Sequence, residues 1–196
     1  IMQGDFQKLD ELVDESTFDV AFAIEATVHS PDRVTCFTGV HKCLKKGGYF
    51  VGYEWIVLPE RGFDKNNADH LRIKEGIEVG NSLPTLATAA EVNKALEDSG
   101  FEVVESFDAN QNVHSELEIP WYDTLNAGLF TLSGFRMSRL GRICTHILLT
   151  ILEFTGIAPK GTVRVSALLN ATAIDLVDGG KAEIFTPSYF FLARKK

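Results

Sequence analysis

Cysteine is scarce in this chain, and so are long apolar runs. Its 196 residues include only three cysteines, an odd number that is too small for a disulfide framework. No apolar stretch approaches the ~20 residues that a helix needs to span a bilayer. The first six residues lack the basic and then apolar pattern of a secretory leader. We therefore expect an intracellular protein whose cysteines are reduced thiols.

Basic charge is also in short supply. The chain has 19 basic and 27 acidic side chains, for a formal net charge of −8. Nucleic-acid binding depends on positive surfaces that neutralise phosphates, so a nucleic-acid partner is not expected. Apolar residues make up 45% and charged residues 23% of the chain, which is typical of a globular protein with one sizeable core.

The first residues of the chain resemble the end of a strand without its earlier part. Gly4-Asp5-Phe6 is typical of the end of a strand, yet only three residues precede it. Ile1 is not an initiator residue. We expect the chain to be the back part of a longer protein.

Three segments predict strands. They lie at 18–24, 49–57 and 101–105. The nearly continuous apolar character of 18–24 and 49–57 favours strands that are buried on both faces of a parallel sheet. Helical signals alternate with these segments. Strands that alternate with helices at short spacing indicate an α/β fold with right-handed crossovers.

Two helices are predicted between these strands. The first begins with Ser30 as N-cap and Pro31 at the first helical position, and the Lys-Lys-Gly-Gly run at 45–48 closes it. The second begins with the capping box at 88–91 and ends at Gly100.

The alternation stops after Phe107. A helix is predicted from Arg142 to Glu153, with an unusually wide apolar face. A second helix, 165–177, is expected to stop at Gly179-Gly180, and an aromatic strand at 185–193 returns to the sheet. We accordingly divide the chain into the C-terminal part of an α/β domain (1–108), a helical region (109–180) and a final strand (181–196).

Acidic side chains follow three of the predicted strands. Asp5 follows the fragmentary first strand, Glu25 ends the next, and Glu54 lies near the end of the third. In open parallel sheets, ligands bind beyond the carboxyl ends of the strands. The three acids therefore predict a functional site there, and the alternative is that they are solvated loop caps. His29 precedes a predicted helix N-terminus, which favours a neutral imidazole that can accept a proton; the alternative is an ordinary loop histidine.

Aromatic residues are plentiful, with 14 Phe, four Tyr and two Trp. Trp55, Trp121 and Tyr122 stand among acids and proline and are candidates for a pocket wall. Aromatic faces stabilise cations where water is excluded, so such a pocket suits a cationic intermediate or a sulfonium cofactor. Cys36, His41 and Cys43 lack the spacing of a four-ligand zinc site, and no metal is expected.

Four spaced blocks of the sequence stand out. They are residues 23–32 (Ala-Ile-Glu-Ala-Thr-Val-His-Ser-Pro-Asp), 53–55 (Tyr-Glu-Trp), 118–122 (Glu-Ile-Pro-Trp-Tyr), and 179–181 with 185–187 (Gly-Gly-Lys and Phe-Thr-Pro). Together these blocks closely resemble the sterol 24-C-methyltransferase family, which in the first block usually has Cys where Val28 stands and Ala where Ser30 stands.

The resemblance implies a fold and a reaction. The fold would be a partial Rossmann-like class I methyltransferase sheet with a C-terminal helical insertion and a returning last strand. The reaction would transfer a methyl group from S-adenosylmethionine to carbon 24 of a sterol side-chain double bond, through a carbocation that undergoes a hydride shift and then loses a proton. Such a site must exclude water, stabilise a cation and offer a base.

The resemblance also implies roles for particular residues. Glu25 and Glu54 would stabilise the cation or orient the substrate, and His29 would be the base or an orienting group. The substrate pocket would be lined by Tyr53, Trp55, Trp121 and Tyr122. The cofactor would be bound by Gly4, Asp5, Phe6, Ile24 and Glu25.

The chain departs from the family pattern in two places. The family's glycine-rich cofactor loop would lie upstream of Asp5, so we expect the isolated 196 residues to bind cofactor poorly or not at all. We also expect them to expose the edge of the strand at 18–24 unless another segment covers it. At 80–84, where the family usually reads Gly-Asp-Gly-x-Pro, this chain has Gly-Asn-Ser-Leu-Pro. Asn81 argues against a base at this position.

The helix at 142–153 has two interpretations: packing into a core, or contact with a membrane surface. Arg136, Arg139 and Arg142 lie where they would meet anionic head groups in the second case. We expect peripheral contact with the endoplasmic reticulum or lipid-droplet surface, and self-association. The rival functions are a related methyltransferase that acts on another lipid or triterpene, and an inactive lipid-binding module.

Overall fold

The computed structural model describes residues 2–111, 119–125 and 138–196. The chain forms two compact units. The first unit contains Ile1–Phe63, Ser82–Asn112 and Ile184–Lys196, and the second contains Asp64–Asn81 and Val113–Glu183. Each unit is described separately below.

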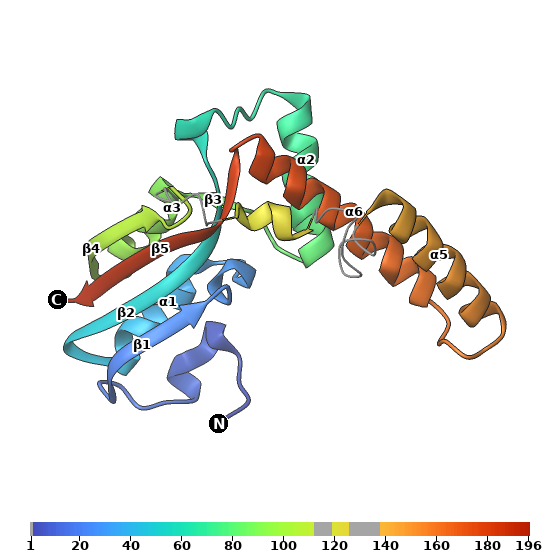
Figure 1. The fold of residues 1–196 in the computed structure, drawn as a ribbon. Helices are drawn as coiled ribbons and strands as arrows, with labels where there is room; N and C mark the ends of the chain where they lie inside the picture. The colour runs from blue at the N-terminus through green and yellow to red at the C-terminus, as the bar shows by residue number, and fades with distance from the viewer. Residues whose placement is uncertain (1, 112–118, 126–137) are drawn as a thin grey trace. The chain divides into compact units, whose positions relative to one another are not determined.

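The first unit is built on a five-stranded sheet (Figure 1). The strands run in the order β1-β2-β5-β4, and β3 pairs with β2 off this path. Their bounds are β1 (Phe18–Ile24), β2 (Leu44–Val57), β3 (Ala87–Thr88), β4 (Phe101–Asp108) and β5 (Phe185–Lys195). The α/β class and the returning last strand predicted from the sequence are confirmed.

The sheet is mixed rather than wholly parallel. β1 and β2 pair in parallel, whereas β5 runs antiparallel to both of its neighbours, β2 and β4. The chain enters β5 next to the end of β2, where the Leu58 N–H donates to the Ile184 carbonyl at 2.9 Å. Because β5 starts beside the carboxyl end of β2, it runs in the opposite direction to β2. It lies between β2 and β4, which therefore run parallel to each other.

The first helix begins later than its sequence predicts. Helix α1 (Arg33–Cys43) is capped by Asp32, whose carboxylate accepts the Thr35 N–H at 3.1 Å. Ser30 instead ends the 3-10 turn η2 (Thr27–His29), and its hydroxyl accepts a hydrogen bond from the Gln7 side chain. The predicted C-terminal signal at 45–48 was also wrong, because those residues already belong to β2.

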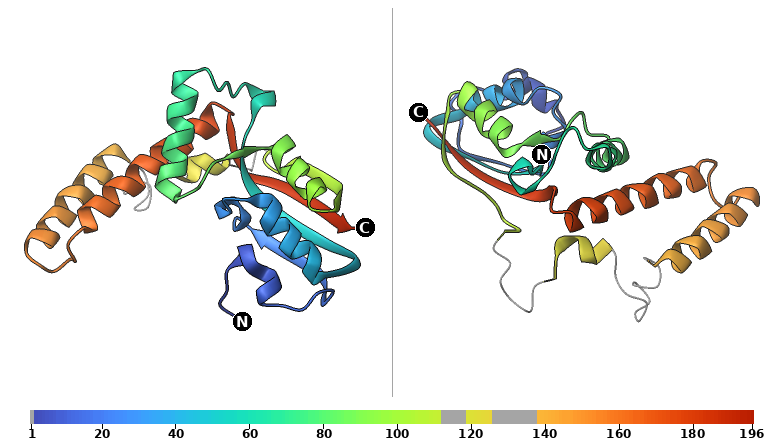
Figure 2. Two further views of the ribbon diagram at one scale, coloured as in Figure 1. Left: turned by 180° about the vertical axis from the view of Figure 1, so that it is seen from behind. Right: turned by 90° about the horizontal axis from the view of Figure 1, so that it is seen from above.

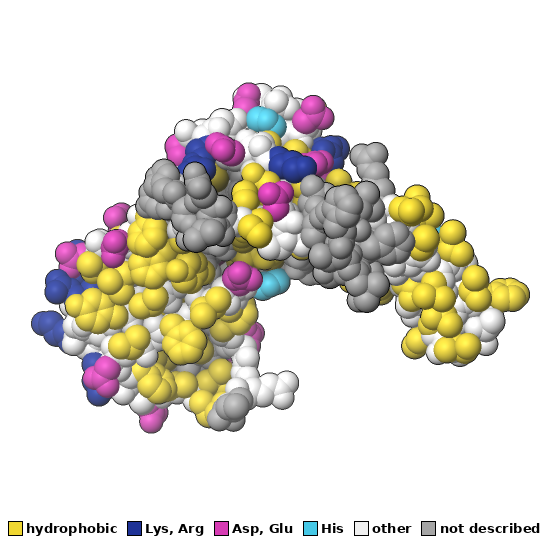
Figure 3. Space-filling view, in the orientation of Figure 1, with side chains coloured by type: hydrophobic (Ala, Val, Ile, Leu, Met, Phe, Trp, Pro, Cys, Tyr) yellow, Lys and Arg dark blue, Asp and Glu magenta, His cyan; other side chains and the backbone are white. Residues whose placement is uncertain are grey.

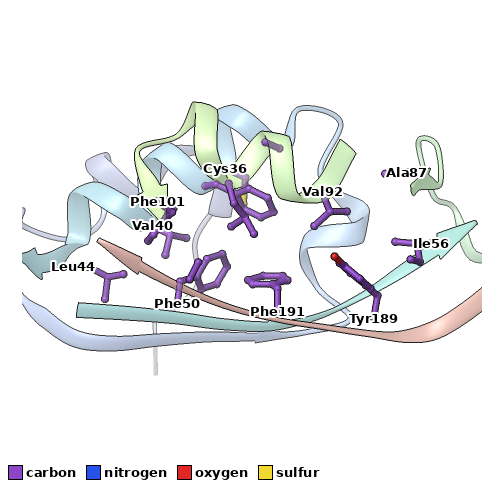
Figure 4. Packing of buried hydrophobic residues seen from close by; sticks show 14 of the residues in the cluster. Cys36, Val40, Leu44, Phe50, Ile56, Ala87, Val92, Phe101, Tyr189 and Phe191 are labelled. Atoms are coloured by element: carbon purple, nitrogen blue, oxygen red, sulfur yellow. The ribbon is translucent and has the colours of Figure 1, made fainter. Parts of the chain in front are cut away.

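Helices α1 and α3 (Ala89–Asp98) cover one face of the sheet (Figure 4). Phe50 and Phe191 point from the sheet toward the helices, with ring centroids 5.0 Å apart, and Phe37 of α1 packs edge-on against Phe50 at 5.6 Å. The predicted capping box of α3 is present, with Thr88 and Glu91 bonded reciprocally. Burial of these rings is the main favourable contribution to the first unit.

The strand at 18–24 is not buried on both faces as predicted. β1 pairs only with β2 among the described residues, and Val20, Phe22 and Ile24 are exposed. These side chains lie on the sheet face opposite α1 and α3, and apolar side chains gather over this face in Figure 3. An apolar run therefore identified the strand correctly but not its surroundings.

The second unit is helical. It contains α2 (Ala68–Asn81), the 3-10 helix η4 (Trp121–Leu125), α5 (Arg139–Phe154) and α6 (Thr162–Lys181). Helices α5 and α6 form an antiparallel hairpin (Figure 2). The stop predicted at Gly179-Gly180 was wrong, because α6 continues to Lys181. Gly180 is a packing residue instead: a Cβ there would overlap the ring of Tyr122.

Helix α2 was not predicted from the sequence. It packs on α6 through glycines, and a Cβ at Gly76 or Gly80 would overlap the side chain of Asp175 or Thr172 respectively. The close approach brings Arg72 within 2.7 Å of the Asp175 carboxylate. Glycine often marks the end of a helix, but here Gly76 and Gly80 allow α2 to pack closely against α6.

Gly80→Ala tests this packing, because the packing determines whether the substitution raises or lowers the free energy of unfolding. An exposed helical Gly→Ala change usually stabilises by about 1 kcal/mol, but overlap with Thr172 should reverse the sign and destabilise by about 1–3 kcal/mol. Urea unfolding measures the difference. Val79→Ala, at an exposed position next to it in α2, is the control and should change stability by less than about 0.5 kcal/mol. A more stable Gly80→Ala protein would contradict the proposed packing.

Candidate functional site

The parallel pairing of β1 with β2 brings Glu25 and Tyr53 side by side. Glu25 directly follows β1, and its N–H donates to the Tyr53 carbonyl at 3.1 Å, which extends the parallel pairing by one residue. Glu25 has φ +52°, in the left-handed region that side chains other than glycine and asparagine rarely adopt. Such strain concentrates at functional sites. The side chain is exposed, so its carboxylate is available to a ligand.

Glu54 occupies a different environment. Its side chain is 0% exposed, on the helix-covered face of the sheet that also contains Phe50 and Ile56. The Thr27 hydroxyl donates to one carboxylate oxygen, and Arg33 lies 3.6 Å from the other. Burial raises the pKa of Glu54 above its ordinary value, and the nearby Arg33 charge and the Thr27 hydrogen bond only partly oppose this.

The two carboxyl groups therefore do not share one open site. Glu25 faces solvent, whereas Glu54 lies in the interior among the described residues. The Glu54 atom Oε2 and the Arg33 atoms Nε and Nη2 are buried and make no hydrogen bond within the described part of the chain. An ion pair this long, buried and incompletely hydrogen-bonded contributes little to stability. Together, the Thr27 hydrogen bond and the Arg33 contact hold the connection after β1 and helix α1 against β2.

His29 lies at the end of the same connection. It closes η2, its N–H donates to the Ala26 carbonyl at 3.1 Å, and its side chain is exposed. Thr27 and Val28 between Glu25 and His29 are buried. The connection therefore presents two candidate site residues, Glu25 and His29, to solvent, and its middle residues are held in the interior.

Two of the predicted pocket residues, Tyr53 and Trp55, lie two positions apart in β2. The ring of Tyr53 meets Phe190 of β5 at 5.5 Å, and that of Trp55 meets Phe185 at 5.6 Å. Trp55 Nε1 is buried and has no hydrogen-bond partner among the described residues. The aromatic character predicted for this region is thus present as cross-strand pairs between β2 and β5.

The predicted cofactor residues at the N-terminus approach this connection. Asp5 caps the 3-10 helix η1 (Phe6–Glu11) and accepts the Gln7 N–H at 2.9 Å. The Gln7 side chain in turn donates to Ser30, the residue after His29. Gly4 and Asp5 are exposed, Phe6 packs against the edge of the core, and Ile24 is exposed at the end of β1.

Trp121 and Tyr122 belong to the second unit. Their rings contact each other at 5.6 Å and pack on α6 at Gly180. Glu118, from the same sequence block, lies outside the described residues. The second unit also contains a groove of about 870 Å³ between α5 and α6, whose lining includes Arg142, Thr145 and Leu169. This volume is within the range of small-molecule sites, and sequence reasoning did not identify it.

Sequence reasoning also missed Thr27 and Arg33, the partners of Glu54. The available signal was the position of Glu54 within an otherwise apolar strand, because a buried carboxylate requires nearby donors. Cys36, one turn along α1 from Arg33, is buried too, and burial raises the pKa of its thiol to about 12, so it remains protonated. Among the described residues, no three His, Cys, Asp or Glu side chains gather as a metal site.

Glu54→Gln tests the buried carboxyl group through pH. Because the pKa of Glu54 is raised above 4.5 in the folded chain, the folded state retains a proton that the unfolded state has lost. Wild-type stability should therefore fall relative to Glu54→Gln as pH rises from 4.5 through the raised pKa. Urea unfolding from pH 4 to 8 measures this. Glu97→Gln, exposed on α3, should track the wild type, and a pH-independent difference for Glu54→Gln would refute the assignment.

Two family models match the chain. One, described as sterol methyltransferase C-terminal, matches residues 132–196, and the other, described as methyltransferase domain, matches residues 1–52. Together they span more than half of the chain.

The chain is also similar to named proteins along nearly its whole length. It is 42% identical over 194 residues to cycloartenol-C-24-methyltransferase 1 of Oryza sativa subsp. japonica, which covers 99% of this chain and 54% of that protein. It is 40% identical over 203 residues to a sterol 24-C-methyltransferase of Saccharomyces cerevisiae, covering 99% of this chain and 51% of that protein. The chain thus spans about half the length of the relatives that it matches.

Solved structures confirm the predicted fold at low sequence identity. The cyclopropane synthase MmaA2 from Mycobacterium tuberculosis matches with a TM-score of 0.60 at 14% identity, covering 95% of this chain and 58% of that one. The geranyl diphosphate C-methyltransferase from Streptomyces coelicolor A3(2) matches with a TM-score of 0.56 at 15% identity, covering 96% and 49%. The sequence blocks, the fold and the similarity to named relatives agree: the chain belongs to the sterol 24-C-methyltransferase family.

Proposed function

We propose that the protein transfers a methyl group from S-adenosylmethionine to carbon 24 of a sterol side-chain double bond. The observation that carries this proposal is 42% and 40% identity, over 99% of the chain, to relatives named for methylation at that carbon. The exposed Glu25 and His29 at the end of β1 provide the groups that this chemistry needs.

The residues at this strand end fit the adenosine part of the cofactor. Its ribose hydroxyls and adenine amine are hydrogen-bond donors, which carboxylates accept. Asp5 and Glu25 are both exposed carboxylates, and the Gln7–Ser30 hydrogen bond ties the turn that begins at Asp5 to the connection that follows Glu25. Asp5 would accept from the adenine amine, and the backbone beside Glu25 would accept from the ribose.

When bound, the cofactor supplies an electrophilic methyl group on a sulfonium. The alkene electrons of the sterol would attack that methyl carbon while its bond to sulfur breaks. The sulfur would leave as a neutral thioether, and a tertiary cation would remain on the substrate. After a hydride shift, loss of a proton restores a neutral product. Glu25 would stabilise the passing positive charge electrostatically, and the His29 imidazole would accept the proton.

Tyr53 and Glu54 would support this site in different ways. Tyr53 and its partner Phe190 form part of an aromatic surface, and ring faces favour a nearby cation. Glu54 has no exposed surface, so we assign it a positioning role: through Thr27 it holds the connection that presents Glu25 and His29.

Glu25→Gln in the full-length protein tests the proposal. The change preserves the shape of the side chain but removes its charge, so the methylation rate should fall by about 100-fold or more. Transfer of isotopically labelled methyl groups to sterol measures the rate, and mass spectrometry of the product locates the new carbon. Glu97→Gln, a matched change on the exposed face of α3, should retain wild-type turnover.

Two outcomes would contradict the proposal. Wild-type turnover by Glu25→Gln would remove Glu25 from the reaction. Methylation of another lipid or triterpene, with no methylation of sterols in the same panel, would replace the proposed substrate. Circular dichroism of each variant separates loss of activity from loss of fold.

A further inference from the structure

The outer face of α5 is apolar and exposed. Large side chains recur along it at intervals of three or four residues, which places them on one side of the helix. Each is more than half exposed, although an amphipathic helix normally turns such a row toward a core. Figure 3 shows apolar side chains gathered over this helix. The row consists of Leu140, Ile143, Ile147, Ile151 and Phe154.

The apolar row continues into the loop at the tip of the hairpin. Phe154 is 90% exposed and Ile157 is 76% exposed. The loop is nevertheless well anchored, because the Glu153 carboxylate accepts the N–H groups of Gly161 at 3.0 Å and Val163 at 2.8 Å. These contacts satisfy donors that a helix start would otherwise leave unpaired. A fixed loop thus holds two large apolar side chains out in solvent.

The charge of the hairpin is opposite to that of the chain. From 138 to 181 the sequence contains five basic residues and three acids, and Glu153 is the only acid before Asp175, whereas the whole chain has a net charge of −8. Lys160 and Arg164 are exposed at the same end of the hairpin as Phe154 and Ile157.

The arginine cluster predicted to bind head groups is not the origin of this charge at the tip. Arg142 donates to the carbonyls of Leu125 and Asn170 at 3.2 and 3.3 Å, inside the second unit. Arg136 and the side chain of Arg139 lie outside the described residues. The exposed basic residues that accompany the apolar row are therefore Lys160 and Arg164.

We propose that the outer face of α5 and the tip of the hairpin dock on the surface of a bilayer that contains anionic lipids. Phe154 and Ile157 enter the boundary between head groups and acyl chains, α5 lies along the surface, and Lys160 and Arg164 contact lipid phosphates. No helix among the described residues is long and apolar enough to cross a membrane, which is consistent with a peripheral element.

Charge favours a bilayer over a second copy of the hairpin. Two copies whose α5 helices pair in the same direction would bring their basic tips together, and like charges that meet across an interface oppose association. An anionic lipid surface instead meets apolar and basic side chains with complementary groups. The docking surface does not depend on methyl transfer and goes beyond the proposed function.

Vesicle flotation of the full-length protein tests the proposal. Phosphatidylcholine vesicles that contain phosphatidylserine should bind the wild type, and vesicles of phosphatidylcholine alone should bind it more weakly. Phe154→Ser with Ile157→Ser should reduce binding by about tenfold or more, as should Lys160→Glu with Arg164→Glu. All four side chains are exposed, so the fold should survive, which circular dichroism checks.

Matched controls make the result specific. Met2→Ser with Val79→Ser removes two apolar side chains that are each 70% exposed, and Lys46→Glu with Lys65→Glu makes the same charge change at exposed lysines. Both should bind vesicles like the wild type. Equal binding by the tip variants and their controls would overturn the proposal. So would a dimer, detected by light scattering, that the tip changes abolish without any vesicle binding by the wild type.

A separate readout distinguishes this proposal from the proposed function. Methylation of detergent-dispersed sterol should be unchanged in Phe154→Ser with Ile157→Ser, because neither residue is a candidate site residue or lines the groove between α5 and α6. Activity lost in detergent along with vesicle binding would contradict a role limited to docking.

Discussion

The buried contact between Thr27 and Glu54 is the constraint on which the candidate site depends. Parallel pairing of β1 with β2 brings the Glu25 N–H to the Tyr53 carbonyl, one residue before Glu54. The Thr27 hydroxyl then reaches down to the Glu54 carboxylate, and Arg33 approaches the same carboxylate from α1. A buried acid is costly, but this one joins two strands and a helix at a single point. The exposed Glu25 and His29 flank that point, so their positions follow from it.

The two units are packed in different ways. In the first unit, large rings such as Phe50 and Phe191 fill the space between sheet and helices. Their burial makes a rigid support for the strand ends where ligands bind. In the second unit, Gly76, Gly80 and Gly180 allow close approach of backbone and rings.

Local signals in the sequence predicted the elements whose stability is local. The capping box at Thr88–Glu91 fixed the start of α3, and apolar runs located β1 and β2. Ser30 and Asp32 both resemble N-caps, and the choice depends on a distant residue, because Gln7 engages the Ser30 hydroxyl. Helix α2 carries few buried apolar residues, only Ile73 and Ile77, so its pattern is weak and its stability comes from contact with α6.

The same distinction applies to the site. Position along the sheet predicted that Glu25 would end one strand and that Glu54 would lie near the end of the next, and the structure places Glu25 directly after β1 and Glu54 inside β2 (Leu44–Val57). Which side of the sheet each carboxylate faces was not predictable without the pairing register, since alternate residues of a strand point to opposite faces. Glu54 lies on the face covered by α1, whereas Glu25 lies past the end of β1, where the left-handed turn directs it into solvent. The partners of Glu54, which are Thr27 and Arg33, could be recognised only from the three-dimensional structure.

Amide hydrogen exchange in Thr27→Val tests the central contact most directly. The change keeps the shape of the side chain but removes the hydroxyl that donates to Glu54. We expect faster exchange in the connection from Glu25 to His29, with the Glu25 amide losing protection as its bond to Tyr53 opens more often. The paired strands β4 and β5 should exchange as in the wild type. Unchanged exchange between Glu25 and His29 would show that the connection is held without Thr27 and Glu54, contrary to this account.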